Sequence, residues 1–393
     1  MKLERPRLEI HLVNSESDFL ELVETLSQNQ GSLGLDAERA SGFRYSHKAY
    51  LIQIADPNSG NWLVDPIATS DENLWAKLNQ VLHARTWILH AATQDLPCLA
   101  DLGLRPSQIF DTEVAAKLIG LEKVGLGSIA SELLELDLAK EHSASDWSQR
   151  PLSEEMLSYA ALDVDVLHDL EKALLVRLEE LGRLSWMEQE MQYLVGFRPK
   201  APKAEPWRSL PGVSKFREIE QIQIAASLWT VRDRIAREQD IAPGRLIPDR
   251  SISTAATMKP KTKSELAANK EFHGRASRTM LDIWWQAILD SKSLEVEIRE
   301  PEDPNYLPNH RSWERRFPEA HARLEAVRPK ILELATTLGI PPENLLSPDS
   351  LRRVCFEPAQ DIAEQLRTLR ARQWQLDLVV PVITAALVEL QQG

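Results

Sequence analysis

Short apolar runs alternate with longer amphipathic stretches through the first 195 residues, and this alternation constrains the fold more than any other feature. Apolar runs of strand length occur at residues 8–13, 32–38, 50–55, 61–64 and 87–90. Helical spacing occurs at residues 15–27, 71–82, 94–102, 112–121, 127–134 and 153–194. The alternation predicts a domain of mixed α and β structure.

Two proline-rich segments divide the rest of the chain. Residues 196–213 contain four prolines among basic residues, and residues 299–309 contain three. Proline fixes φ and removes a backbone donor, so both segments favour extended connectors. The apolar spacing is helical elsewhere, which predicts a first domain at 1–195 and all-α domains at 214–298 and 310–393.

The two helical segments resemble each other. Val231 and Arg232 precede the sequence IAPGRLIPD at residues 241–249, and Val327 and Arg328 precede IPPENLLSPD at residues 340–349. Such internal similarity predicts two related helical modules.

The charge of the chain is unevenly distributed. The 393 residues carry a net charge of −13, which taken alone argues against a protein that coats nucleic acid. Residues 198–282, however, contain 17 Lys and Arg against 10 Asp and Glu, a local balance of +7. A basic middle between acidic ends indicates a local function for that segment.

The chain start and the cysteines bear on the cellular compartment. The charged start is followed by no apolar signal region, and we expect no window to approach the roughly 20 apolar residues of a membrane span. Cys98 and Cys355 lack the spacing of a zinc site or a disulfide framework. These features favour a cytoplasmic protein with reduced core cysteines.

A pair of carboxylates stands out on a predicted strand. Asp36 and Glu38 lie at i and i+2 in the apolar sequence LGLDAE, so both side chains point to one face. Adjacent carboxylates repel each other unless a cation joins them, and oxygen ligands suit Mg²⁺ or Mn²⁺.

The same Asp-x-Glu spacing recurs at Asp111 and Asp169, so spacing alone identifies nothing. Asp169 falls in a helical pattern, where a solvated face explains the pair. Asp111 opens a helix, where capping is the preferred interpretation and a supporting role near a site stays open. We expect His90 to be a hydrogen-bonded residue at a strand end.

Two further positions are candidates for chemistry. Asp95 follows a strand and falls in the first turn of a helix, where sites of α/β sheets gather. Tyr159 and Asp163 are four residues apart, so the phenol and the carboxylate share one helical face. In isolation, a buried Tyr with an N-capping or surface Asp is the favoured explanation of that pair.

The order of these elements resembles the three exonuclease motifs of the DEDDy class, and ribonuclease D in particular. Further positions similar to the family are residues 50–54, 63–66, 89–91, 110–112 and 145–147, together with Lys140. The helical modules are similar to HRDC domains, the second more divergent than the first. The resemblance implies a ribonuclease H-like α/β exonuclease domain, with a mixed sheet flanked by helices, followed by two HRDC-type all-α domains.

The resemblance also implies an activity, 3′–5′ hydrolysis of RNA to nucleoside 5′-monophosphates. Asp36, Glu38, Asp95 and Asp163 would bind two divalent ions, Mg²⁺ or Mn²⁺, and Tyr159 would orient the attacking water. Transfer RNA precursors or other structured RNAs with a single-stranded 3′ end would be the substrates, and no membrane partner is expected. A monomer is the simplest expectation.

Nucleic-acid contacts are expected from polar residues near the site and in the basic segment. The candidates are Arg39, Gln53, Lys140, Arg232, Arg234, Arg237, Lys259, Lys261 and Lys263. A solvated helix face explains the three helical arginines equally well. Arg39 stands where the family usually has an aromatic residue, and Ala37 where it usually has Thr, so base stacking at Arg39 is not implied.

Two other functions remain open. The same carboxylates and tyrosine serve DNA-directed exonucleases, although no polymerase or helicase motif accompanies them here. A degenerate exonuclease could also act as a catalytically silent RNA-binding scaffold, although carboxylates at all four positions argue against it.

Overall fold

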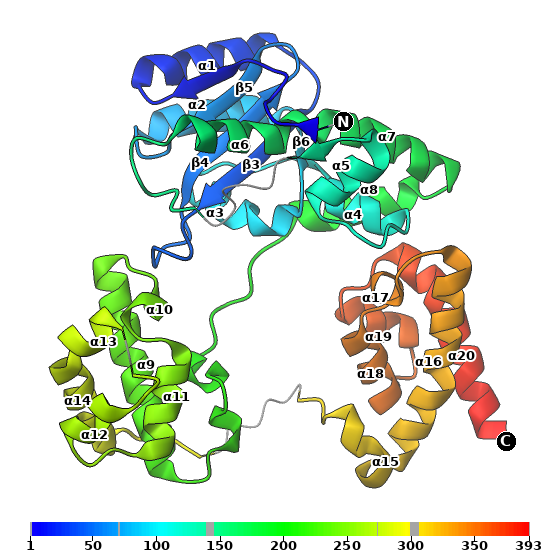
Figure 1. Ribbon diagram of the computed structural model, residues 1–393. Helices are drawn as coiled ribbons and strands as arrows, with labels where there is room; N and C mark the ends of the chain where they lie inside the picture. Colours follow the sequence, from blue (N-terminus) through cyan, green and yellow to red (C-terminus); the bar gives the residue numbers. More distant parts are fainter. Residues whose placement is uncertain (1, 70, 139–144, 273, 299–305, 393) are drawn as a thin grey trace.

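The computed structural model contains three domains. It describes residues 2–69, 71–138, 145–272, 274–298 and 306–392. An α/β domain extends to residue 195, and two helical domains follow at residues 206–298 and 306–392. Both helical domains lie on the same side of the α/β domain, below it in Figure 1, and contact different parts of it.

The α/β domain is built on a mixed six-stranded sheet. Its strands are β2 Ile10–Val13, β3 Leu33–Arg39, β4 Ala49–Asp56, β5 Gly60–Val64, β6 Thr86–Leu89 and β7 Gln108–Asp111. They are ordered β2-β5-β4-β3-β6-β7, with β4 antiparallel to both of its neighbours and the other pairs parallel. The mixed sheet and its five expected strands are confirmed, and β7 is a sixth strand that the apolar runs did not predict.

A separate parallel pair of short strands joins the chain start to a later loop. It consists of β1 Lys2–Leu3 and β8 Asp137–Leu138. Neither strand was expected, because two-residue strands show no alternating pattern.

Helices cover both faces of the six-stranded sheet. They are α1 Glu16–Gln28, α2 Glu72–His83, α3 Leu96–Asp101, α4 Thr112–Leu118, α5 Leu126–Leu134, α6 Glu154–Asp165, α7 Leu167–Glu180 and α8 Leu184–Val195. The single helical stretch expected at 153–194 is wrong in one respect, because three helices form there. The chain breaks at Val166 and turns at Gly182, whose φ is +67°.

Strand β4 lies in the middle of the sheet and is buried along its whole length. Ile52 and Ile54 share a core cluster with residues of α1 and α2. Leu51 belongs to a second cluster with Ala160 and Ala161 of α6. Successive side chains of a strand point to opposite faces, so α6 covers the face that carries residues 51, 53 and 55.

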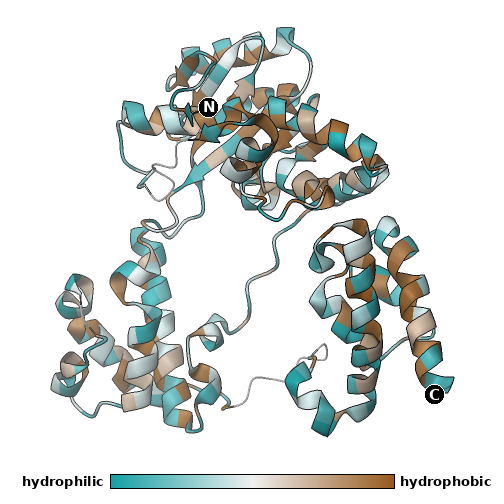
Figure 2. Ribbon diagram, turned by 45° about the vertical axis from the view of Figure 1, so that its right-hand side comes forward, coloured by the Kyte–Doolittle hydropathy of each residue, from teal (hydrophilic) through white to brown (hydrophobic). Residues whose placement is uncertain are grey.

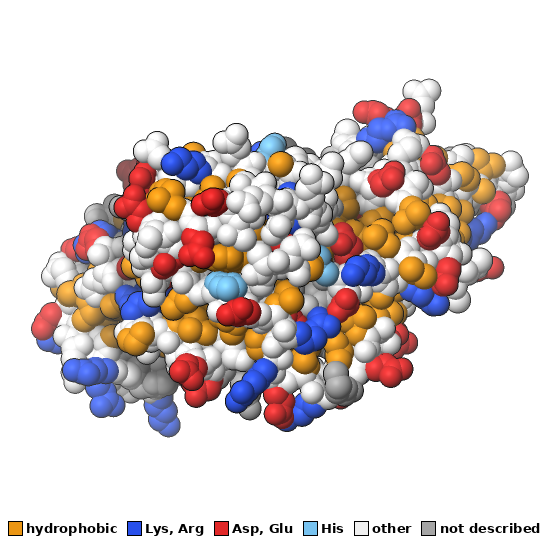
Figure 3. Space-filling view, turned by 90° about the horizontal axis from the view of Figure 1, so that it is seen from above, with side chains coloured by type: hydrophobic (Ala, Val, Ile, Leu, Met, Phe, Trp, Pro, Cys, Tyr) orange, Lys and Arg blue, Asp and Glu red, His pale blue; other side chains and the backbone are white. Residues whose placement is uncertain are grey.

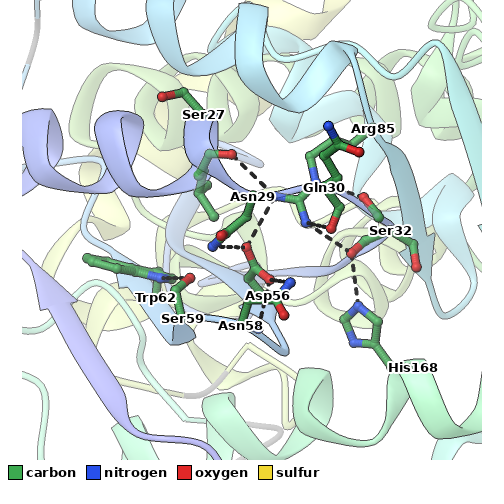
Figure 4. A network of polar contacts seen from close by, with 12 residues as sticks. Ser27, Asn29, Gln30, Ser32, Asp56, Asn58, Ser59, Trp62, Arg85 and His168 are labelled. Atoms are coloured by element: carbon green, nitrogen blue, oxygen red, sulfur yellow. Dashed lines mark hydrogen bonds and ion pairs between the residues drawn. The ribbon is translucent and has the colours of Figure 1, made fainter.

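A buried ion pair joins the ends of several elements beneath α1 (Figure 4). The Arg85 guanidinium lies 3.2 Å from the Asp56 carboxylate, with 6% and 0% of these side chains exposed. Arg85 also donates to the carbonyl oxygens of Gln30 and Gly31, at 3.2 and 2.7 Å. Asn29 donates to Asp56 at 3.1 Å. These contacts hold the end of β4 against the turns that precede β3 and β6.

The first helical domain begins before its expected boundary at residue 214. Trp207, Leu210 and Val213 belong to its core, so the extended connector is limited to residues 196–205. Its helices are α9 Ile219–Gln239, α10 Pro243–Leu246, α11 Asp249–Met258, α12 Lys263–Ala268, α13 Arg275–Thr279 and α14 Leu281–Asp290. Trp284 is fully buried in this core.

The second helical domain shares a core with the α/β domain. Its helices are α15 Trp313–Arg316, α16 Pro318–Leu338, α17 Pro342–Leu345, α18 Pro348–Phe356, α19 Ile362–Thr368 and α20 Gln373–Gln392. Trp374 stacks on Trp186 with ring centroids 4.6 Å apart. Arg183 donates to the carbonyl oxygens of Leu118 and Leu338, which end α4 and α16. These contacts join the two domains into one packed unit.

Helix α20 corrects the expectation about membrane-length segments. Hydrophobic residues extend along much of it (Figure 2). In the part of the chain that the structure describes, it is the one helix with the length and composition of a membrane span. Its buried hydrophobic residues, among them Val379 and Ile383, belong to the core shared with α16 and α8.

The outer surface, seen from above in Figure 3, has no single dominant charge. Acidic and basic side chains are interspersed there among hydrophobic and uncharged ones. Interspersed charge of this kind favours solubility over the capture of a polyanion.

Candidate active site

Strand β3 presents the first two carboxylates. Asp36 and Glu38 lie on the face that α6 covers, because Asp36 pairs directly with Gln53 of β4 and Glu38 with Leu51. The Ala37 amide donates to Asp36 at 2.8 Å. The β3–β4 pairing shifts register after Glu38, which ends regular pairing beside the site.

A tight turn after β6 places Asp95. Ala91 adopts a left-handed conformation (φ 57°), and Asp95 occupies the position before the first residue of α3 without a side-chain capping bond, which leaves its carboxyl group free to face the site. The buried Asp111 carboxylate accepts the Ala91 and Ala92 amides at 3.2 and 2.7 Å, besides the Glu113 and Val114 amides of α4. Asp111 is therefore a helix cap, as expected, and it also holds the turn that carries Asp95.

His90 has no catalytic contact in this arrangement. Its Nδ1 lies 2.9 Å from the Thr112 hydroxyl. Burial lowers the pKa of His90 to about 4, so the ring is neutral at pH 7. The expectation of a hydrogen-bonded histidine at a strand end is confirmed.

Helix α6 brings Tyr159 and Asp163 over the same face. The Tyr159 hydroxyl is hydrogen-bonded to the Asp163 carboxylate. The last residue of α6, Asp165, accepts from Arg7 Nε at 2.7 Å and from Asn61 Nδ2 at 3.2 Å. These bonds fix α6 against the sheet, and no sequence pattern indicates this role of Asp165.

Burial raises the pKa of all four carboxyl groups. Desolvation is the largest cause at each, and neighbouring carboxylates add to it at Glu38, Asp95 and Asp163. The pKa of Glu38 rises to about 9 and that of Asp163 to about 8. Burial raises the pKa of Asp36, and burial together with the charge of Asp36 raises the pKa of Asp95 well above its ordinary value. The four carboxyl groups therefore cannot all ionise at neutral pH unless a cation compensates their charge.

The donor set fits a hard divalent cation. All four groups are carboxylates, as Mg²⁺ and Mn²⁺ prefer, and cation binding would displace their protons. Among the described residues, no three Asp, Glu, His or Cys side chains are already gathered as a ligand set. An ion would therefore have to draw the protonated carboxyl groups together.

The metal-free protein should lose stability as the pH rises from about 4 to 9. Glu38 and Asp163 keep protons in the folded state that the unfolded chain releases near pH 4. The folded state then binds more protons, so the free energy of unfolding falls by up to about 1.4 kcal/mol per pH unit for each such proton. Urea unfolding in chelator between pH 5 and 9 measures the slope. Glu38→Gln should flatten it, and an unchanged slope would contradict the assignment.

Arg39 is the one cation whose contact with this cluster the described residues show. Its Nη2 lies 3.7 Å from Asp95 Oδ1, and its charge lowers the pKa of Asp36, Glu38 and Asp95 against the effect of burial. Its side chain is 28% exposed, so a phosphate could still reach it. Sequence reasoning placed Arg39 near the substrate but missed its contact with Asp95.

The structure reassigns two of the expected nucleic-acid contacts. Gln53 is fully buried in β4, where RNA cannot reach it. Arg232 is 4% exposed, pairs with Asp249 at 2.7 Å and donates to the Ile247 carbonyl oxygen. Burial makes both residues structural, because a phosphate contact needs an accessible side chain. Lys140 lies outside the described residues.

The remaining candidates are accessible but engaged in ion pairs. Their pairs are Arg234 with Glu238, Arg237 with Asp233, Lys259 with Glu218, Lys261 with Glu220, and Lys263 with Asp282. Exposed pairs contribute little stability, so a phosphate can replace the carboxylate. Their contacts with nucleic acid stay predictions.

The first helical domain docks on the β3–β4 loop, residues 40–48, directly beyond Arg39. The Asp240 carboxylate accepts the Ser46 amide at 2.9 Å and the Tyr50 hydroxyl at 3.3 Å. Arg245 donates to the Gly42 carbonyl oxygen at 2.7 Å. The Tyr45 hydroxyl donates to Asp233 at 3.0 Å. Part of the basic segment thus holds a loop at the edge of the site.

Comparison with known families gives three matches along the chain. Residues 10–179 match a family described as 3′–5′ exonuclease, and residues 221–288 match the HRDC domain. Residues 306–387 match a family described as 3′ to 5′ exonuclease C-terminal domain. The three matches follow the three structural domains.

Individual relatives extend over most of the chain. A ribonuclease D from Pseudomonas paraeruginosa is 30% identical over 321 residues, which cover 81% of this chain and 82% of that protein. A crystal structure of a protein from Bifidobacterium adolescentis is 33% identical, covers 98% of this chain and 99% of that one, and superposes with a TM-score of 0.89. The structure of Escherichia coli ribonuclease D, an exoribonuclease involved in structured RNA processing, shares the fold at 24% identity and a TM-score of 0.71, covering 97% of this chain and 99% of that one.

Proposed function

The chain belongs to the ribonuclease D family and is a 3′–5′ exoribonuclease, and from this premise we propose that it trims transfer RNA precursors and other structured RNAs with two divalent ions. One observation carries the proposal. Three distant segments of the chain bring Asp36, Glu38, Asp95 and Asp163 into one buried, mutually repelling group beside Tyr159.

Each side chain has a separate task in this proposal. The four carboxylates would hold Mg²⁺ or Mn²⁺, whose chemistry is to supply a water of lowered pKa and to stabilise charge on the leaving 3′ oxygen. We assign Tyr159 the orientation of the attacking water. Burial, with the charges of Asp163 and Glu38, raises the pKa of Tyr159, so the hydroxyl stays a hydrogen-bond donor at neutral pH.

The substrate would reach the site from the side of the helical domains. The opposite face carries interspersed charges (Figure 3), whereas the basic segment lies in the first helical domain beside the β3–β4 loop. The water oxygen would attack phosphorus as the P–O3′ bond breaks, so the product is a nucleoside 5′-monophosphate without a covalent enzyme intermediate.

The buried free thiols of Cys98 and Cys355 support a reducing, cytoplasmic setting for the protein. We also propose that it is a monomer.

A ladder assay tests this proposal. Single-stranded RNA, DNA of the same sequence, and a transfer RNA precursor with a 3′ extension are labelled at the 5′ end and incubated with Mg²⁺, Mn²⁺ or chelator. Metal-dependent shortening of RNA from the 3′ end is expected, stopping near the structured part of the precursor. Equal shortening of DNA would favour a DNA-directed exonuclease. RNA binding without any cleavage would favour a silent scaffold.

Asp240→Ala is expected to lower kcat/KM for RNA by roughly 10-fold, since hydrogen bonds to a charged group contribute about 1.5–3 kcal/mol. The change removes the bonds from Ser46 and Tyr50 that hold the β3–β4 loop. Initial rates on short RNA measure the effect. Glu238→Gln is the matched control, because Glu238 lies on the same helix and pairs with the exposed Arg234. Equal rates in both variants would show that the loop does not depend on this contact.

A further inference from the structure

Gln53 is an unusual buried residue. Its side chain is fully buried in the middle of β4, and neither its amide oxygen nor its amide nitrogen has a hydrogen-bond partner in the described part of the chain. A buried amide without partners costs stability, because it loses its bonds to water and gains none. An apolar residue of similar size would be more stable there, so the amide calls for another explanation.

The position of Gln53 in the sheet supplies an explanation for its buried amide. It lies opposite Asp36 on one side and Leu63 on the other, in the two antiparallel pairings of β4. Directly opposite residues in such a pairing share a face, with Cβ atoms about 4.5–5.5 Å apart. Leu51, Leu63 and two alanines of α6 form the apolar cluster over this face. Of the two residues directly opposite Gln53, Leu63 on β5 is apolar, and Asp36 on β3 is therefore the polar one.

Asp36 has an oxygen available for a further hydrogen bond. Its Oδ1 accepts the Ala37 amide at 2.8 Å. A carboxylate has two acceptor oxygens, so Oδ2 can accept another donor. The Gln53 amide nitrogen, which belongs to the residue directly opposite Asp36, lacks an acceptor in the described part of the chain.

We propose that Gln53 is a positioning residue for Asp36, which donates its amide N–H to the Asp36 carboxylate when divalent cations occupy the cluster. The inference rests on the proposed function, because it assumes that the cluster binds cations. The hydrogen bond fixes the direction of the carboxylate, as the outer partners of metal ligands generally do. The stability lost in the metal-free protein is recovered in the loaded one.

Binding of Mn²⁺ alone tests the proposal without RNA or turnover. Titration of the full-length protein, followed by electron paramagnetic resonance of free Mn²⁺, should give a Kd about 10–100-fold weaker for Gln53→Leu than for the wild type. The Tm of the same variant in chelator should be unchanged or about 2–4 °C higher, because a buried unpaired amide is gone. On RNA, kcat should fall with little change in KM, because Gln53 cannot touch the substrate.

Trp284→Phe is the matched control. It also removes a buried N–H without a partner, but from the core of the first helical domain. This variant should change Tm and leave the Kd for Mn²⁺ at the wild-type value. If Gln53→Leu fails to fold, Gln53→Asn carries the test, because it keeps an amide but withdraws it from Asp36, and it should weaken Mn²⁺ binding as well.

Two outcomes separate this inference from the proposed function. Wild-type Mn²⁺ affinity in a folded Gln53 variant would overturn the inference and leave the exoribonuclease untouched. Weaker Mn²⁺ binding in Gln53→Leu, combined with a wild type that hydrolyses no RNA, would support the inference and refute the proposed function.

Discussion

Replacing Asp95 by Asn is expected to lower the rate of RNA hydrolysis by at least about 10²–10³-fold, the loss typical when one preorganised electrostatic group is removed from an active site. Asp95 lies at the start of α3, whereas Asp36 and Glu38 lie on β3 and Asp163 on α6, and the charge of Asp36 acts on its carboxyl group. Asn removes a charge that the cations need. The rate of ladder formation in Mg²⁺ measures the effect.

The same variant should be at least as stable as the wild type in chelator. Burial and the neighbouring Asp36 raise the pKa of Asp95 well above its ordinary value, so ionising it costs folding free energy at neutral pH. Asp101→Asn is the matched control, because Asp101 is exposed at the end of the same helix, and it should change neither activity nor Tm. A stable Asp95→Asn protein with normal activity would remove Asp95 from the site.

Arg85→Met should reduce the free energy of unfolding by about 3–5 kcal/mol, the usual cost of leaving one partner of a buried ion pair uncompensated. Asp56 would keep a buried charge, and the carbonyl groups of Gln30 and Gly31 would lose their donor (Figure 4). Urea unfolding at pH 7 measures the change.

An exposed ion pair provides the comparison for Arg85. Arg177 and Glu180 form a surface pair with 57% of each side chain exposed, so Arg177→Met should cost less than about 1 kcal/mol. Similar losses in the two variants would mean that the Arg85 pair is solvated in solution. A large loss for Arg85 alone would confirm that it holds the end of β4.

Local periodicity explains why part of the site was predictable. The two-residue period of a strand puts Asp36 and Glu38 on one face, and the helical period does the same for Tyr159 and Asp163. Both depend only on the segment that carries them. The burial of Gln53 depends on strand register, and that of Arg232 depends on packing between helices. Both are set by segments far away in the sequence, so the residues next to Gln53 and Arg232 do not predict their burial.

The same distinction holds for the fold. Turn residues and apolar runs located five strands within two residues, but one continuous helical pattern concealed the breaks at Val166 and Gly182. The packing of the second helical domain on α8 through Trp186 and Trp374 has no sequence signal of its own. It becomes visible only when both helices are folded.

The ten-residue extended connector at residues 196–205 has a consequence for how the first helical domain remains in place. A tether of this kind keeps the domain at an effective concentration of roughly millimolar near its docking surface. An interface with a Kd of about 10 μM between separate molecules would then be closed about 99% of the time within one chain. A weak interface is therefore enough to hold the β3–β4 loop within one chain. If the α/β domain and the first helical domain were supplied as separate polypeptides at micromolar concentration, the loss of a single interface contact would lower the activity.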